Sequence, residues 1–235
     1  MIDSIIRNTV GNTEDYIVGF ADLEGLNLPY TFGIVIGKRL DDKIIDSIKT
    51  GPTLQYFNYY NKINKDLSGL IHDIENQLIE MGYDCCVVEP SNAGQDATDE
   101  EYRKTLRTPV SHKMIATRAG LGWIGKTDLF ISKEFGPRLR LVSLLTNYPL
   151  EITGEPTDSS KCGKCEICIV NCPANAATGQ LWDIYTDRDV FFDAHKCRNT
   201  CRELVKKLLG LDSAACGICI SVCPVGIKRK STIVD

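Results

Sequence analysis

The sequence lacks the segments that would carry it into or across a membrane. Its first ten residues, MIDSIIRNTV, contain no basic stretch followed by an apolar run and a cleavage site, and no apolar run approaches the roughly 18 residues of a membrane span. A surplus of positive charge is also missing, because 27 Lys and Arg stand against 31 Asp and Glu, for a net charge of -4. We therefore expect a cytoplasmic chain with no membrane contact and no strongly nucleic-acid-seeking surface.

Cysteine is nearly absent from the first 160 residues and abundant after them. Only Cys85 and Cys86 precede residue 160, whereas nine of the 11 cysteines lie between Cys162 and Cys223. In a reducing compartment these cysteines are not expected to form disulfides, so the later group indicates metal binding. The early pair lies in an apolar run typical of a strand, which would turn one of the two thiols inward as a small hydrophobe.

The change in cysteine content falls in a segment typical of a linker. Residues 151–161, EITGEPTDSSK, replace apolar periodicity with Gly, Pro, Ser, Thr and acidic residues. A chain of 235 residues is long enough for one domain of about 150 residues and a smaller one. We predict an N-terminal domain at 1–155 and a C-terminal domain at 156–235.

Apolar patterning in the first part predicts a mixture of helices and strands. A stripe from Leu67 to Ile79 indicates a helix that ends at Gly82, and residues 110–119 carry a second helical pattern. Short apolar runs predict strands at 16–20, 30–36, 85–89, 128–132 and 139–145. This mixture predicts an α+β or α/β layer, and we assign the chain to the α+β class.

Two cysteine motifs dominate the last third of the chain. Residues 162–173 read CGKCEICIVNCP, the bacterial ferredoxin run in which three cysteines bind one 4Fe-4S cluster and the fourth binds another. Residues 216–224 read CGICISVCP, which is the second half of such a module without its first cysteine. We predict that Cys197 supplies the missing ligand, with Cys201 as the competing candidate.

The two-cluster pattern assigns four thiolates to each cluster. Cluster one is predicted to be bound by Cys162, Cys165, Cys168 and Cys223. Cluster two is predicted to be bound by Cys172, Cys197, Cys216 and Cys219. Two tetrahedral zinc sites are the alternative, but the triple spacing followed by Cys-Pro favours clusters.

A glycine-rich segment at 120–125 reads GLGWIG and matches the dinucleotide motif G-x-G-x-x-G. That motif requires a strand before it and a helix after it, whereas here a helical pattern precedes and a strand follows. The three glycines instead predict a tight loop. Its backbone would either approach something large and flat or simply be packed by Trp123.

These motifs resemble the epoxyqueuosine reductases and, more distantly, the reductive dehalogenases. The resemblance is carried by AGLGWIGK at 119–126, LTNYPLE at 145–151, FDAHKC at 192–197 and the two cysteine motifs. It implies a nitroreductase-like α/β domain that binds base-off cobalamin, followed by a ferredoxin-like domain with two 4Fe-4S clusters. It also favours Cys197 over Cys201. The implied cobalamin-binding residues are Gly120, Leu121, Gly122, Trp123, Ile124, Gly125 and Lys126.

The sequence departs from that family at its proton donor. The family carries an acid just before the Pro-Val that precedes the glycine segment, whereas this chain reads TLRTPVSHK at 105–113. His112 is a candidate replacement, because histidine can donate a proton near neutral pH. Tyr102 and Lys113 are further candidates. The alternative is that His112 is an ordinary hydrogen-bonded helix residue.

The expected function is that of an iron-sulfur reductase. An external donor of the flavodoxin or ferredoxin class would reduce the clusters, which would reduce a cobalamin or a substrate. A non-catalytic electron carrier is one alternative, and a reductive activator of a corrinoid protein, which needs no proton donor, is another. Binding of tRNA is doubtful, because the chain stops twelve residues after Cys223 and its basic run is only KRK at 228–230.

Overall fold

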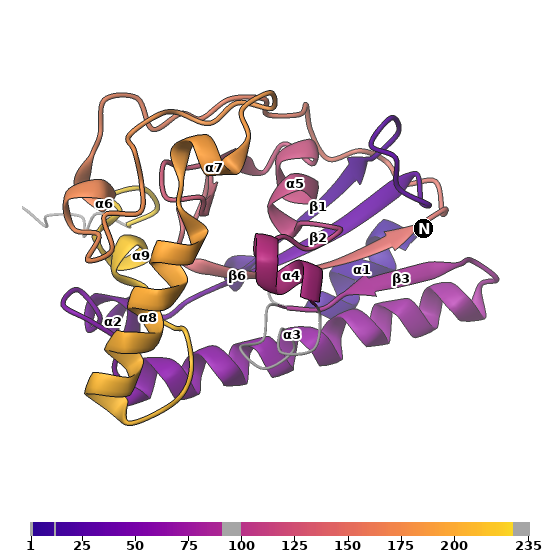
Figure 1. Ribbon diagram of the computed structural model, residues 1–235. Coiled ribbons are helices and arrows are strands. Elements are labelled where there is room, and N and C mark those ends of the chain that lie inside the picture. Colours follow the sequence, from indigo (N-terminus) through magenta and orange to yellow (C-terminus); the bar gives the residue numbers. More distant parts are fainter. Residues whose placement is uncertain (1, 12, 91–99, 228–235) are drawn as a thin grey trace, which may run out of the picture.

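The computed structural model describes residues 2–11, 13–90 and 100–227, and these form a mixed α/β fold (Figure 1). The first part of the chain forms α1 (Ile2–Val10), η1 (Thr13–Asp15), β1 (Tyr16–Asp22), β2 (Phe32–Arg39), α2 (Asp42–Asp46), α3 (Leu54–Glu80), β3 (Cys85–Val88), α4 (Glu100–Thr105), α5 (His112–Arg118), β4 (Gly122–Ile124), β5 (Phe130–Ser132) and β6 (Leu139–Thr146). The later part forms α6 (Ile167–Val170), α7 (Arg188–Phe191), α8 (Ala194–Leu209) and α9 (Ile218–Val222).

A four-stranded antiparallel sheet lies at the centre, with the strand order β1-β2-β6-β3. Its strands are apolar on both faces, because both faces are covered. Ile34 and Ile36 point into one core with α1 and α3, whereas Val35 points into another core with α5. In Figure 1 the long α3 runs along one side of the sheet and α5 lies on the other.

Helix α3 confirms the predicted helix and is longer than predicted. Thr53 caps its first turn by accepting a hydrogen bond from the Tyr56 backbone, and Gly82 follows its end with φ at 86°. Its early turns are rich in Asn, Lys and Tyr, which hid the apolar stripe there. The predicted strands and the second helix are also present with shifted ends. Cys85 packs against the core while Cys86 is exposed, as predicted.

Part of the glycine-rich segment is a strand and not only the predicted loop. Strand β4 pairs with β5 to form a short antiparallel hairpin in which Trp123 lies opposite Ile131. Gly122 makes this pairing possible, because a β-carbon there would lie 2.1 Å from the carbonyl oxygen of Ile131. We call residues 122–132 the glycine hairpin.

The cysteine-rich part packs directly against the N-terminal part. Val205, Ala215 and Ile220 from α8, α9 and the loop between them join the same buried core as Ile48 and Tyr56. The proposed division at residue 155 remains a prediction. No described helix is long and apolar enough to cross a membrane, and the KRK run lies outside the described residues.

Candidate functional site

The glycine hairpin touches the thiols predicted for cluster one. The indole Nε1 of Trp123 donates a hydrogen bond to Cys162 Sγ at 3.4 Å, and the Thr127 hydroxyl is hydrogen-bonded to the Cys168 thiol. Gly125 packs so closely that a β-carbon there would lie 3.5 Å from Cys162 Sγ. A segment of the N-terminal part therefore forms one wall around these cysteines.

The structure brings the cysteines of each predicted set into one neighbourhood. Burial raises the pKa of the Cys223 thiol to about 11, and its electrostatic neighbours include the other three cysteines assigned to cluster one. Burial also raises the pKa of Cys219, whose electrostatic neighbours are Cys197, Cys216, Cys168 and Cys172. Three of these four belong to the cluster two set. The ligand assignment itself remains a prediction.

Cys201 lies among the cluster two cysteines as an additional thiol. Its Sγ is 3.9 Å from Cys197 Sγ, one helical turn away on α8, and it is also hydrogen-bonded to Cys216. These hydrogen bonds raise the pKa of Cys201 and lower those of Cys197 and Cys216. Sequence spacing left Cys197 and Cys201 as competing ligands of cluster two, and the structure places both thiols near Cys216.

The donor set suits iron-sulfur clusters, because soft thiolates are the usual ligands of such clusters. All 11 cysteines are free of disulfides, so every predicted ligand keeps its thiol. Within the described part of the chain, no three His, Cys, Asp or Glu side chains lie close enough to hold a single metal ion.

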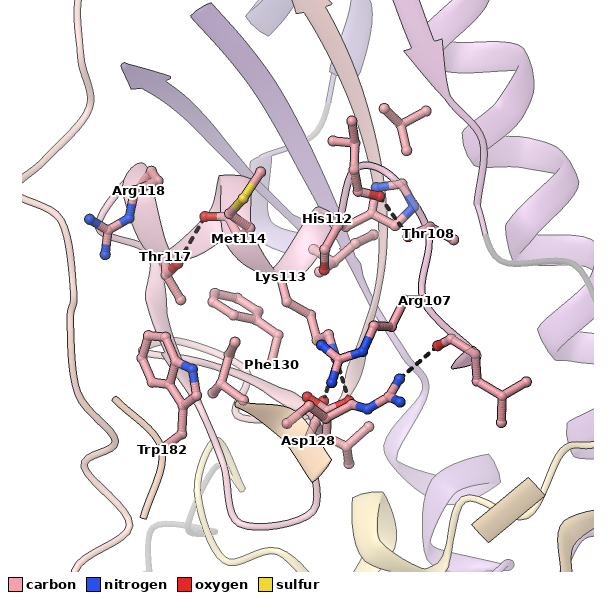
Figure 2. A pocket seen from close by; sticks show the side chains of 18 of the residues that line it. Arg107, Thr108, His112, Lys113, Met114, Thr117, Arg118, Asp128, Phe130 and Trp182 are labelled. Carbon is pink, nitrogen blue, oxygen red and sulfur yellow. Dashed lines mark hydrogen bonds and ion pairs between the residues drawn. The ribbon is translucent and has the colours of Figure 1, made fainter. Parts of the chain in front are cut away.

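A cavity of about 1000 Å³ lies on the other side of the glycine hairpin. Its wall is built from α4, α5, the glycine hairpin, β6 and the loop around residues 182–188 (Figure 2). Met114, Phe130 and Trp182 form apolar parts of the lining. This volume is at the upper end of the range for small-molecule sites, so the cavity has room for a large ligand.

The acidic side chains that line the cavity are already engaged. Lys113 Nζ lies 2.6 Å from Asp128 Oδ2 and donates a hydrogen bond to the Asp128 carbonyl oxygen at 3.0 Å. Arg107 forms an ion pair with Asp187 at 2.6 Å. Glu89, the remaining carboxylate of the described lining, contacts His72 Nε2 at 2.7 Å. Each carboxylate in the described lining therefore has a basic partner.

His112 lines the cavity, but both of its ring nitrogens are used inside the protein. Nδ1 lies 2.9 Å from Ser143 Oγ, and Nε2 lies 3.0 Å from the Glu89 carbonyl oxygen. Because a carbonyl only accepts, Nε2 carries the proton and Nδ1 accepts from Ser143 when the ring is neutral. Burial lowers the pKa of His112 to about 4, which keeps it neutral near pH 7. These contacts favour the ordinary hydrogen-bonded interpretation.

The predicted site residues divide around the glycine hairpin. Tyr102, His112 and Lys113 all line the cavity, and of the seven residues at 120–126 the structure places only Ile124 there. The others pack elsewhere. A β-carbon at Gly120 would meet the Glu155 carbonyl oxygen at 2.6 Å, Leu121 packs beside Gly19, and Lys126 is buried.

Sequence reasoning missed several residues of the cavity wall. They include Arg107, Arg118, Asp128, Phe130 and Trp182. The nearest signal was the strand predicted at 128–132, whose alternation places Phe130 beside the cavity once β5 pairs with β4. Trp182 lies more than fifty residues away in sequence, and no local pattern connects it to this wall.

Comparison with known protein families and structures identifies relatives for both parts. The model of the 4Fe-4S double cluster binding domain matches residues 161–226. An epoxyqueuosine reductase of Cyclobacterium marinum is 28% identical over 202 residues, which are 80% of this chain and 62% of that protein. An epoxyqueuosine reductase of Synechocystis is 34% identical over 134 residues, which are 55% of this chain and 45% of that protein.

Solved structures share the fold at low sequence identity. A catabolic reductive dehalogenase matches 92% of this chain and 30% of its own, with a TM-score of 0.63 and 16% identity. Epoxyqueuosine reductase from Bacillus subtilis matches 97% of this chain and 67% of its own, with a TM-score of 0.56 and 16% identity. The chain spans less than two thirds of the length of the curated relatives described above.

The cysteine motifs and the matching domain define this chain as an iron-sulfur protein with a 4Fe-4S double cluster domain. Within that class, its resemblance to the epoxyqueuosine reductases is confirmed by sequence, and its more distant likeness to the reductive dehalogenases is confirmed by fold.

Proposed function

We propose that this chain is a reductase in which two 4Fe-4S clusters deliver electrons to a base-off cobalamin or a substrate in the cavity. One observation carries the proposal: residues of the cavity wall directly follow, in the chain, residues that contact or belong to the two sets of cluster cysteines. Ile124 lines the cavity and follows Trp123, which is hydrogen-bonded to Cys162. Ile220 also lines it and follows Cys219. Electrons leaving either cluster would therefore find an acceptor close by.

The cavity fits cobalamin in two respects. It is large, and its wall combines apolar side chains with Lys and Arg, which suits a wide ring with polar amide groups. His112, the histidine of the described lining, already uses both nitrogens, so it offers no imidazole to the metal. The base-off state implied by the family resemblance agrees with this. When bound, cobalamin would supply a strongly reducing metal centre. A solved reductive dehalogenase of similar fold is described as B12-dependent.

Lys113 is the best placed of the three predicted proton donors. Its ammonium group lies at the cavity wall and is oriented by two oxygen atoms of Asp128. His112 is held neutral with both nitrogens engaged, and the Tyr102 ring lies beside the Arg198 guanidinium, 5.9 Å from ring centre to carbon. We assign Lys113 the role of holding and donating a proton at Nζ.

The external electron donor to the clusters would be a flavodoxin or a ferredoxin.

Activation of a corrinoid protein is a second candidate, favoured by the paired carboxylates. Because each acid of the described lining has a basic partner, the cavity offers no spare carboxylic acid to protonate a product. Delivery of an electron to a metal requires no such group. A non-catalytic electron carrier would use neither the cavity nor Lys113. A solved epoxyqueuosine reductase holds an epoxyqueuosine-modified tRNA stem loop, which weighs against the doubt about tRNA raised from the sequence and makes tRNA a plausible substrate class.

Addition of cob(II)alamin to the anaerobic, cluster-loaded chain tests the proposal. Binding should remove the nitrogen superhyperfine splitting from the EPR spectrum as the lower base is released. Ser111→Trp should prevent this change, because Ser111 lines the cavity and its side chain makes no cap hydrogen bond. Leu54→Trp is the matched control, since Leu54 is 55% exposed at the start of α3. A spectrum identical to that of free cobalamin would favour the carrier or the activator.

A further inference from the structure

Five thiols, not four, gather where cluster two is expected. Cys172, Cys197, Cys216 and Cys219 are the predicted ligands, and Cys201 is the additional one. Cys201 is not at the edge of the group, because it is hydrogen-bonded to two of the four, Cys197 and Cys216. Its Sγ is 3.9 Å from Cys197 Sγ, so rotation of the two side chains between rotamers can bring either sulfur atom to the same position.

Helix α8 fixes this arrangement. Cys197 and Cys201 are four residues apart, so both side chains lie on the same face of the helix. Asp193 caps the helix by accepting a hydrogen bond from the Lys196 backbone, and Val205 is fully buried one turn after Cys201. Both thiols therefore face Cys216 from a helix that is fixed on either side of them, by the cap before Cys197 and by buried Val205 after Cys201.

We propose that the fourth ligand position of cluster two is shared: either Cys197 or Cys201 can bind the iron atom. The inference rests on the ligand assignment of the proposed function. In the exchange one Fe-S bond replaces another, the entering thiol releases its proton and the leaving thiolate takes one up, and no oxidation state changes. Cys172 provides the contrast, because no hydrogen bond among the described residues joins it to a spare thiol.

Iron and sulfide content of full-length, anaerobically reconstituted variants tests the proposal. The wild type should hold about eight iron atoms, and Cys197→Ala and Cys201→Ala should each hold the same number. The double variant should fall to about four, as should the matched control Cys172→Ala. Equal losses in Cys197→Ala and Cys172→Ala would overturn the proposal. A wild type that holds about four iron atoms would instead overturn the underlying two-cluster assignment.

A second measurement avoids the loss of a ligand altogether. Cys201→Ala keeps all four assigned ligands, so it should fold and load normally. Exposure to an iron chelator should remove cluster two several-fold faster from Cys201→Ala than from the wild type, because no second thiol recaptures the iron when Cys197 dissociates. Cluster one should be lost at the same rate in both. Equal rates for cluster two would contradict the shared position.

Discussion

The two sides of the glycine hairpin face different chemistry. On one side, Trp123 and Thr127 donate hydrogen bonds to thiols, whereas on the other, Ile124 and Phe130 line the cavity. Neighbouring strand residues point to opposite faces, which is why Trp123 and Ile124 serve different sides. The comparison teaches that one short hairpin separates the thiols assigned to cluster one from the cavity, although Ile124 also lies in a small core with Cys172 and Cys197. Changes to the Trp123 side should leave the cavity side intact.

Collapse of the whole wall should have the largest effect. Gly122→Ala would place a β-carbon 2.1 Å from the Ile131 carbonyl oxygen, so the pairing of β4 with β5 must shift. We expect the free energy of unfolding to fall by about 4 kcal/mol, near the upper limit for single substitutions. Both the thiol side and the cavity side of the hairpin should be disrupted, so we expect weaker loading of cluster one and loss of cobalamin binding.

Gly69→Ala is the matched control for that variant. Gly69 lies within α3, and a β-carbon there would meet no atom within 4 Å. The free energy of unfolding should rise by about 1 kcal/mol, because alanine is a better helix former than glycine. Denaturant unfolding measures both changes. Similar effects of the two alanines would show that the hairpin backbone is not under this constraint.

Acid should lower the stability of the folded protein, because it protonates the buried His112 at the cavity. Burial lowers the pKa of His112 from 6.5 to about 4, so the folded state favours the neutral ring. Stability is complete above the unfolded pKa of 6.5 and is lost as the pH falls toward 4, by roughly 3 kcal/mol in total. Urea unfolding between pH 7.5 and 4 should show this loss in the wild type but not in His112→Asn.

His72 supplies the control, because it responds to pH with the opposite sign. Hydrogen bonds to Glu75 and Glu89 raise the pKa of His72, so its contribution is present at low pH and is lost as the pH rises through the raised value. His72→Gln should therefore keep the acid-side loss of stability. If that variant removed the loss, His112 would not be its source.

The gathering of the cysteines was predictable from sequence because much of its information is local, whereas the assignment of each thiol to a cluster stays a prediction. Cysteine spacing over short loops brings the thiols of each motif together, and the resemblance placed Cys197 near them. The cavity side was much less predictable. Asp128 and Trp182 reach the same cavity only after the hairpin, α5 and a distant loop have packed together. Glycine spacing at 120–126 marked the right segment, but not that Trp123 and Gly125 face a thiol while Gly120 packs against the linker.

Removal of the cavity's lysine should have a moderate effect. Lys113→Met leaves the Asp128 carboxylate, which is 15% exposed, without its cation, so we expect a loss of roughly 2 kcal/mol in stability. Substrate reduction should fall if Lys113 holds the proton, whereas reduction of the clusters by dithionite should be unchanged. That split would confine the effect to the cavity side.

A double variant separates the lost charge pair from the lost proton. Asp128 has φ at 57°, which asparagine tolerates, so Lys113→Met combined with Asp128→Asn should recover most of the stability. Substrate reduction should stay low in the double variant. Recovery of turnover along with stability would rule out Lys113 as the proton donor.

Loss of one hydrogen bond to a thiol should have the smallest effect, and the effect should be confined to cluster one. Trp123→Phe keeps an aromatic ring but removes the donor to Cys162 Sγ, so reduced cluster one loses stabilisation and its potential becomes more negative. The shift should be at most about 40 mV, the one-electron equivalent of a hydrogen bond worth roughly 1 kcal/mol. Tyr185→Phe is the control, since it also removes a polar group from an aromatic side chain, and Tyr185 lines the cavity. Redox titration followed by EPR should show a shift of cluster one alone in Trp123→Phe and none in Tyr185→Phe. Equal shifts of both clusters would mean that the hairpin does not separate the two sides.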